Sequence, residues 1–165
     1  MARKISERRL NRLLELNEKL VLENDFSKRI KIISDTIKDI LKVDRCTIFL
    51  YDKDCKSMWS VYIDGVSYIE VPYNKGVVGE VFKTKKIVIV NDMKKNKKFG
   101  NLIDIGSGYT TNSLLAVPIL GYDGDILGVM QLINKVDGDS NFDQEDEKIL
   151  NYVIGHISAY LEIMT

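Results

Sequence analysis

Apolar residues in the first forty positions recur every three or four residues, as they do on one face of a helix. This spacing predicts a helix over residues 4–42, interrupted at Asn24-Asp25, with Ser27 beginning its second segment. The apolar side chains of the second segment share one face, which is suited to covering a sheet. They are Ile30, Ile33, Ile37, Ile40 and Leu41.

The first helical segment also carries a short heptad pattern. Leu10, Asn17 and Asn24 are seven residues apart, and Leu13 and Leu20 occupy the position three residues later. Asparagine at such positions sets the register of two-stranded coiled coils. The pattern spans only about two and a half heptads. Two interpretations of residues 1–25 therefore remain open: a signalling or coiled-coil helix, and an amphipathic helix lying on its own domain.

From residue 45 onward, short β-branched and aromatic runs alternate with turn residues, which predicts strands joined by hairpins. The expected strands are residues 45–51, 57–63, 86–90, 113–120 and 125–134. Residues 66–73 are expected to end extended, and residues 76–84 to form a short helix. The segment Gly121-Tyr122-Asp123-Gly124 is a strong hairpin turn, and Asp143 is expected to cap a long final helix.

This order of elements indicates the α+β class over residues 26–165. We expect a central antiparallel sheet of five to six strands, with the N- and C-terminal helices packed on one face. Residues 91–110 are polar and rich in lysine and glycine, which predicts a long loop. Because loops of this length in compact domains are usually functional, we expect it to act as a lid over a ligand pocket on the other face.

Composition narrows the class of protein. The 165 residues suit one domain, and 24 basic residues balance 24 acidic ones, so the basic excess of a nucleic-acid binder is absent. Cys46 and Cys55 are expected to be reduced thiols, with Cys46 buried in a strand. The charged N-terminus does not resemble a signal peptide, and no apolar run approaches the ~20 residues that span a bilayer. We therefore expect a cytoplasmic protein without membrane insertion.

A search for catalytic chemistry finds no constellation. The single histidine, His156, lies inside the final helix without a carboxylate or cysteine nearby in sequence. There is no nucleophile elbow and no phosphate loop, and residues 137–141 lack the glycine and glutamate of a calcium loop. We expect no catalytic residue, no metal and no enzymatic activity in this domain.

One motif near the C-terminus is specific. Asn134-Lys135 is followed by Phe142 and then by Asp146-Glu147. We expect a Lys135–Asp146 pair to tie the sheet to the closing helix, where an acid also suits the helix dipole, with Phe142 filling the junction. The five residues resemble the signature of GAF domains in cyclic-nucleotide phosphodiesterases and bacterial adenylyl cyclases. The resemblance covers roughly residues 26–164.

The resemblance implies a set of ligand-binding positions and a function. The positions are Thr47, Asp64, Val77, Val78, Phe99, Asp104, Thr111 and Gln131. Gln131 stands where an acid is expected, and Phe99 lies beside the position where the lid should carry an aromatic residue.

The function implied is that of a regulatory sensory domain. It would bind a cyclic nucleotide (cAMP or cGMP) without another cofactor, and form a homodimer through its terminal helices. It would relay occupancy to an effector domain of a longer parent protein. The alternatives are a ligand-free dimerisation module and a GAF sensor of a different metabolite.

Overall fold

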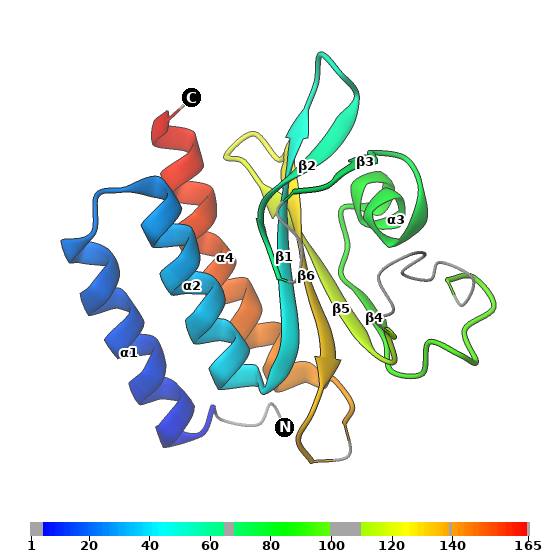
Figure 1. Cartoon of the computed structure of the whole chain (residues 1–165). Helices are drawn as coiled ribbons and strands as arrows, with labels where there is room; N and C mark the ends of the chain where they lie inside the picture. Colours follow the sequence, from blue (N-terminus) through cyan, green and yellow to red (C-terminus); the bar gives the residue numbers. More distant parts are fainter. Residues whose placement is uncertain (1–4, 65–67, 100–109, 139, 165) are drawn as a thin grey trace.

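The computed structural model describes residues 5–64, 68–99, 110–138 and 140–164. Its elements follow the predicted order along the chain (Figure 1). The helices are α1 (Glu7–Leu22), α2 (Phe26–Leu41), α3 (Gly76–Thr84) and α4 (Gln144–Met164). The strands are β1 (Val43–Asp52), β2 (Ser57–Ile63), β3 (Glu70–Pro72), β4 (Val88–Val90), β5 (Leu114–Leu120) and β6 (Ile126–Lys135).

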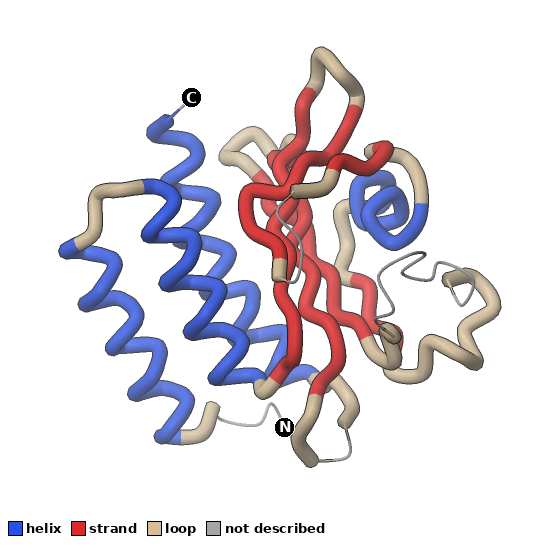
Figure 2. The backbone as a smooth tube through the Cα atoms, in the orientation of Figure 1, coloured by secondary structure: helices blue, strands red, loops and turns tan. Residues whose placement is uncertain are grey.

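The strands form one antiparallel sheet in the order β3-β2-β1-β6-β5-β4. Helices α2 and α4 cover one face of this sheet, and α1 lies outside them as a further layer (Figure 2). Helix α3 packs on the opposite face. The predicted α+β class, with its terminal helices on one face of a six-stranded sheet, is confirmed.

The period of two along each strand divides the core between the two faces. On β1, Cys46 and Ile48 point toward the helices, whereas Phe49 belongs to the cluster beneath α3. A Cβ atom on Gly128 would lie 2.0 Å from the carbonyl oxygen of Phe49, so β1 and β6 approach closely only because residue 128 is glycine. This close pairing places the two central strands side by side beneath α3.

Helix α1 packs against its own domain. Ser6 caps it by accepting a hydrogen bond from the Arg9 amide, and Leu13, Leu16 and Leu20 are buried. Leu10, at a heptad position of the same helix, is 47% exposed. Residues 7–22 therefore lie as an amphipathic helix on the domain, and a coiled-coil role for them stays a prediction.

Candidate functional site

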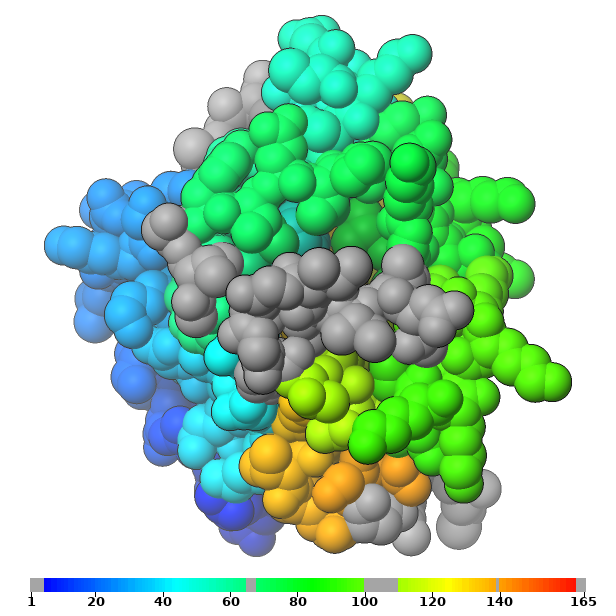
Figure 3. Space-filling model, turned by 45° about the vertical axis from the view of Figure 1, so that its right-hand side comes forward, coloured from blue at the N-terminus to red at the C-terminus, as the bar shows by residue number. Residues whose placement is uncertain are grey.

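A pocket of about 230 Å³ lies between the sheet and α3. Its walls are mostly apolar, with Phe49, Val71 and Leu114 among them. The polar side chains in its described lining are Lys75, Thr111 and Gln131. Figure 3 views the molecule from this side, with the β3–α3 region in green above and the segment after β6 in orange below.

The N-terminus of α3 forms one wall of this pocket. Gly76 has φ +67°, a left-handed conformation that glycine adopts readily, and it turns the chain from extended Lys75 into the helix. The side chain of Lys75, the N-cap residue, makes no capping hydrogen bond. The amides of the first helical turn, at residues 76–78, have no acceptor within α3 itself and lie beside a lysine, an arrangement that favours an anion.

The floor of the pocket comes from the two central strands. Thr47 on β1 lies directly opposite Gln131 on β6. Both share a sheet face with Phe49, because alternate residues of a strand point the same way. Thr47 is buried and Gln131 is half-buried. The floor therefore offers a hydroxyl and an amide, which together can donate and accept hydrogen bonds.

The structure brings most of the predicted ligand-binding residues to this pocket. Val77, Val78, Thr111 and Gln131 line it, and Thr47 adjoins Gln131 on its floor. Phe99 is buried in the core cluster beneath α3, and the Lys98 Nζ atom lies 2.8 Å from Glu80 of that helix. Asp104 lies outside the described residues.

Asp64 is not brought to the pocket. Its carboxylate lies 3.0 Å from Lys38 Nζ on α2 and accepts a 2.9 Å hydrogen bond from the Cys46 amide. Asp64 falls two residues after Tyr62, whose hydroxyl also contacts Lys38, so both side chains lie toward the helices. Burial opposes the charge on Lys38, but hydrogen bonds from this ammonium to Asp64 and Tyr62 outweigh it and raise the pKa of Lys38.

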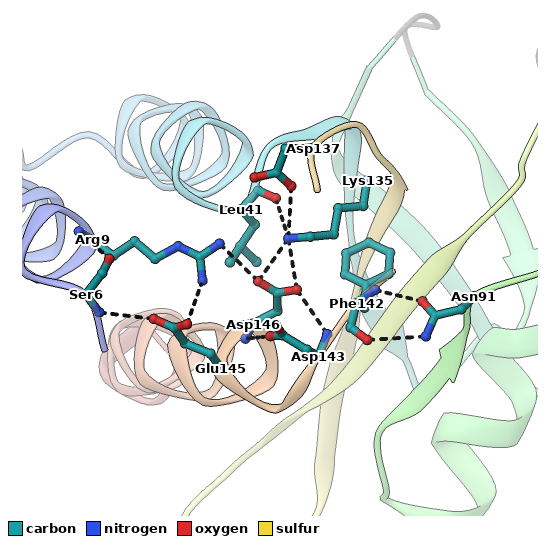
Figure 4. Close-up of polar contacts among 10 residues, drawn as sticks. All are labelled: Ser6, Arg9, Leu41, Asn91, Lys135, Asp137, Phe142, Asp143, Glu145 and Asp146. Atoms are coloured by element: carbon teal, nitrogen blue, oxygen red, sulfur yellow. Dashed lines mark hydrogen bonds and ion pairs between the residues drawn. The ribbon is translucent and has the colours of Figure 1, made fainter. Parts of the chain in front are cut away.

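The predicted pair between Lys135 and Asp146 is present (Figure 4). Lys135 Nζ lies 2.9 Å and 3.1 Å from the two Asp146 oxygens and donates to the Leu41 carbonyl at 3.0 Å. Asp146 is 0% exposed. Burial raises the pKa of Asp146, and Lys135 together with the Asp143 amide offsets this effect only in part.

The same carboxylate also completes the cap of α4. The Asp143 amide donates to Asp146 at 3.1 Å, and the Asp146 amide donates to Asp143 at 3.0 Å. This reciprocal pair is a capping box with an acid at both positions. Asp146, which pairs with Lys135 at the end of β6, therefore also fixes where the last helix begins.

Two asparagines tie the ends of the 91–110 segment to the signature residues. Asn134, at φ +62°, accepts hydrogen bonds from the amides of Asn112 and Ser113 and donates to the Thr110 carbonyl. Asn91 pairs with the backbone of Phe142, accepting at 2.7 Å and donating at 3.2 Å (Figure 4). The signature thus holds both described ends of the segment that borders the pocket.

Helix α1 joins this network through residues that the sequence analysis did not identify. Arg9 lies 3.3 Å from Asp146 and 3.5 Å from Glu145, and the Ser6 amide donates to Glu145 at 3.1 Å. No sequence signal marks Arg9, because its partners are more than 130 residues away. Glu147, the last signature residue, lies apart from the network and lines a groove beside α4.

The thiols lie away from the pocket. Cys46 is fully buried on the helix-facing side of β1, and burial raises the pKa of its thiol to about 12. Cys55 lies in the exposed turn between β1 and β2. Within the described residues, no group of three His, Cys, Asp or Glu side chains is placed to hold a metal ion. Nor does that part of the chain contain a helix long and apolar enough to cross a membrane.

An antiparallel sheet with terminal helices on one face and a helix-walled pocket on the other defines a class of small α+β domains. The family model for the GAF domain matches residues 25–161. The chain belongs to the GAF family, whose members are sensory modules of multidomain proteins.

Sequence relatives include cGMP-specific 3',5'-cyclic phosphodiesterases of fruit flies. The chain is 42% identical to the protein of Drosophila mojavensis and 41% identical to that of Drosophila melanogaster, each over 81 residues. These regions cover 49% of this chain and 7% of each phosphodiesterase.

Solved structures share the fold at lower identity. The GAF domain of an Acinetobacter phosphoenolpyruvate-protein phosphotransferase has a TM-score of 0.79 at 23% identity, covering 93% of this chain and 92% of that one. Free methionine-R-sulfoxide reductase from Neisseria meningitidis, solved with its substrate, has a TM-score of 0.76 at 18% identity, covering 96% and 93%. At these identities the likeness shows the fold alone.

Proposed function

We propose that the chain is a regulatory sensory domain that binds a cyclic nucleotide, cAMP or cGMP, in the pocket beside α3. It would act in the cytoplasm as a homodimer and relay occupancy through its terminal helices to an effector domain of a longer parent protein. The observation that carries the proposal is the N-terminus of α3, which meets an apolar pocket with a polar floor.

The chemistry of this pocket suits a cyclic nucleotide. The amides at residues 76–78 and Lys75 offer donors and positive charge to a phosphate. Apolar walls suit a ribose and a purine face, while Thr47 and Gln131 offer hydrogen bonds to base edges. The 42% identity to a cGMP-specific phosphodiesterase over 81 residues supports the same ligand class.

A binding role is favoured over catalysis. The described lining of the pocket includes neither cysteine nor histidine, the side chains that most often act as redox nucleophile or general base at neutral pH. Cys46 is held as an unreactive buried thiol on the other face of the sheet.

One observation favours a second candidate, a ligand-free dimerisation module. The pocket volume of about 230 Å³ lies below the roughly 300–1,000 Å³ usual for small-molecule sites. Under this alternative the terminal helices assemble the protein and the pocket has no ligand.

Isothermal titration calorimetry with cAMP and cGMP separates the two candidates. We expect binding of at least one nucleotide, and a Gln131→Leu variant that binds about tenfold more weakly because it leaves polar groups of the base unpaired. Gln144→Leu, the same change at an exposed position of α4, is the matched control and should bind like the wild type. The absence of heat and of a thermal shift with both nucleotides at millimolar concentration would rule out the cyclic-nucleotide proposal.

A further inference from the structure

A second cavity, of about 390 Å³, lies at the end of the sheet where β1 ends and β6 begins. Three segments meet there: the β1–β2 hairpin, the β5–β6 turn and the last turns of α4 (Figure 1). Its volume lies within the roughly 300–1,000 Å³ usual for small-molecule sites. None of the described residues lines both this cavity and the pocket beside α3, so the two are separate.

Aromatic and apolar side chains form much of the wall of this cavity. Trp59 of β2, the only tryptophan of the chain, lies directly opposite Leu50 of β1, and both line it. Tyr51 also lines it, and its ring centroid lies 4.8 Å from that of Phe82 on α3 and 5.7 Å from that of Tyr73. Aromatic rings attract organic cations, and tryptophan does so most strongly.

Carboxylates dominate the charged part of the lining. They belong to Asp123, Asp125 and Glu162, and Lys53 is the only cationic side chain among the described lining residues. The pKa of Asp123 is lowered, mainly by a hydrogen bond from the Asp125 amide and to a smaller extent by Lys53. Three acids and one base give the lining a formal net charge of −2. This balance favours a positively charged ligand.

The acid contributed by α4 is held in position by the β5–β6 turn. Glu162 accepts a 2.8 Å hydrogen bond from the Tyr122 amide. A Cβ atom on Gly121 would collide with the same Glu162 oxygen, so glycine lets the turn and the helix approach this closely. Lys85 also contacts the turn, donating to the Gly124 carbonyl at 2.8 Å, but it does not line the cavity. A ligand would therefore meet an acid that is already positioned.

We propose that this cavity binds a small organic cation of the alkylammonium class. Trp59 recognises the ammonium group together with the carboxylates of Asp125 and Glu162, and the apolar part of the ligand packs on Leu50 and Leu161. Because the ligand contacts the hairpin, the turn and the end of α4 together, the cavity serves as a second effector site. This inference does not depend on the binding of a cyclic nucleotide.

Fluorescence of Trp59 reports occupancy directly, because the chain has no other tryptophan. We expect choline, used as the probe, to change this fluorescence with saturation in a titration of the full chain. The neutral analogue in which a carbon atom replaces the nitrogen of choline should bind about tenfold more weakly, because it lacks the cation. Equal binding of the two probes would overturn the cationic class of ligand. The absence of a saturable change at millimolar choline would overturn the site.

Two neutralising variants test the acids. Glu162→Gln keeps an acceptor for the Tyr122 amide, and Asp125→Asn keeps the size of an exposed side chain, so both should fold like the wild type. Each should weaken the binding of choline about threefold, and the double variant about tenfold. Glu18→Gln, the same change at an exposed position of α1, is the matched control and should bind choline like the wild type. A double variant with wild-type affinity would overturn the role of these acids.

The aromatic contact is tested by Trp59→Leu. Calorimetry replaces fluorescence here, because the variant lacks the reporter. We expect choline to bind about fivefold more weakly, since leucine keeps the apolar packing but loses the attraction between ring and cation. Tyr68→Leu, which removes an exposed aromatic side chain outside the cavity, is the matched control. Wild-type affinity in Trp59→Leu would overturn this part of the inference.

Failure of this inference and failure of the proposed function are distinguishable. A chain that binds choline but neither cyclic nucleotide retains the second site and loses the proposed function. A chain that binds a cyclic nucleotide but not choline retains the proposed function and loses the second site.

Discussion

Lys135 and Asp146 form the most buried ionic contact in the described part of the chain, with side chains 6% and 0% exposed. Asp146 accepts hydrogen bonds from Lys135 and from the Asp143 amide and forms an ion pair with Arg9, so its oxygens are well satisfied. A buried pair of this kind contributes little beyond what packed apolar residues would give, but loss of one partner is costly. The main role of the pair is therefore to set how α4 is positioned against the end of β6, and its net contribution to stability is small.

Replacing Lys135 by methionine tests this role at the residue scale. Lys135→Met keeps the length of the side chain but leaves the buried Asp146 carboxylate without its main cation. We expect the free energy of unfolding in urea to fall by about 3 kcal/mol. A further Asp146→Asn change should recover a large part of the loss, and a Lys135→Met variant as stable as the wild type would contradict the role.

Single residues differ in how far the sequence predicts them. Lys135 and Asp146 were predicted as a pair because one ends a strand and the other lies in the next helical turn. The sequence did not predict that Asp64 lies away from the pocket. The register shift between Ile48 and Phe49 and the contact with Lys38 determine on which face of the sheet the Asp64 side chain lies. The direction of this side chain depends on strand register and on contacts with a distant helix, which the local sequence around Asp64 does not reveal.

At the scale of elements, α1 is joined to the signature network. Arg9 is 19% exposed on its side chain and reaches both Glu145 and Asp146 at the start of α4. Lys135 reaches the same carboxylate and also the carbonyl of Leu41 at the end of α2. A shift of the end of β6, which carries Asn134 and Lys135, would therefore disturb contacts of α1, α2 and α4 together.

An Arg9→Ala variant tests this connection. We expect amide hydrogens of α1 to exchange about fivefold faster, because the helix loses roughly 1 kcal/mol of docking energy. Arg8→Ala, at the neighbouring exposed arginine, is the matched control and should leave exchange unchanged. Equal exchange in the wild type and in Arg9→Ala would show that the ion pairs of Arg9 do not hold α1 in place.

The sequence predicted the elements well, and for a physical reason. Their boundaries follow from the apolar period and from turn residues, so β2 and α3 have the predicted bounds. The docking of α1 was left between two alternatives, because Leu13 and Leu20 suit an intramolecular contact as well as a coiled coil. The contact of Arg9 with α4 shows that α1 lies on its own domain, and a coiled-coil role for residues 1–25 stays a prediction.

At the scale of the whole molecule, the sheet separates the face that bears the pocket from the face that bears the terminal helices. Helix α3 lies on one side, while α1, α2 and α4 lie on the other (Figure 1). The pocket lies on the α3 side. The signature residues at the end of β6 connect the two, since Asn134 holds the start of β5 and Lys135 holds the helices. A ligand in the pocket can alter the helical face only if it binds two arrangements of this junction with different affinity.

Binding of a cyclic nucleotide at the N-terminus of α3 is the basis of the proposed function. The most direct test is a titration of the isotope-labelled chain with cAMP and with cGMP, followed by amide resonances in NMR spectra. We expect the amides of Gly76, Val77 and Val78 to shift with at least one nucleotide, while those at the exposed start of α2 near Lys28 do not. Resonances of residues 76–78 that stay unmoved up to millimolar concentrations of both nucleotides would contradict it.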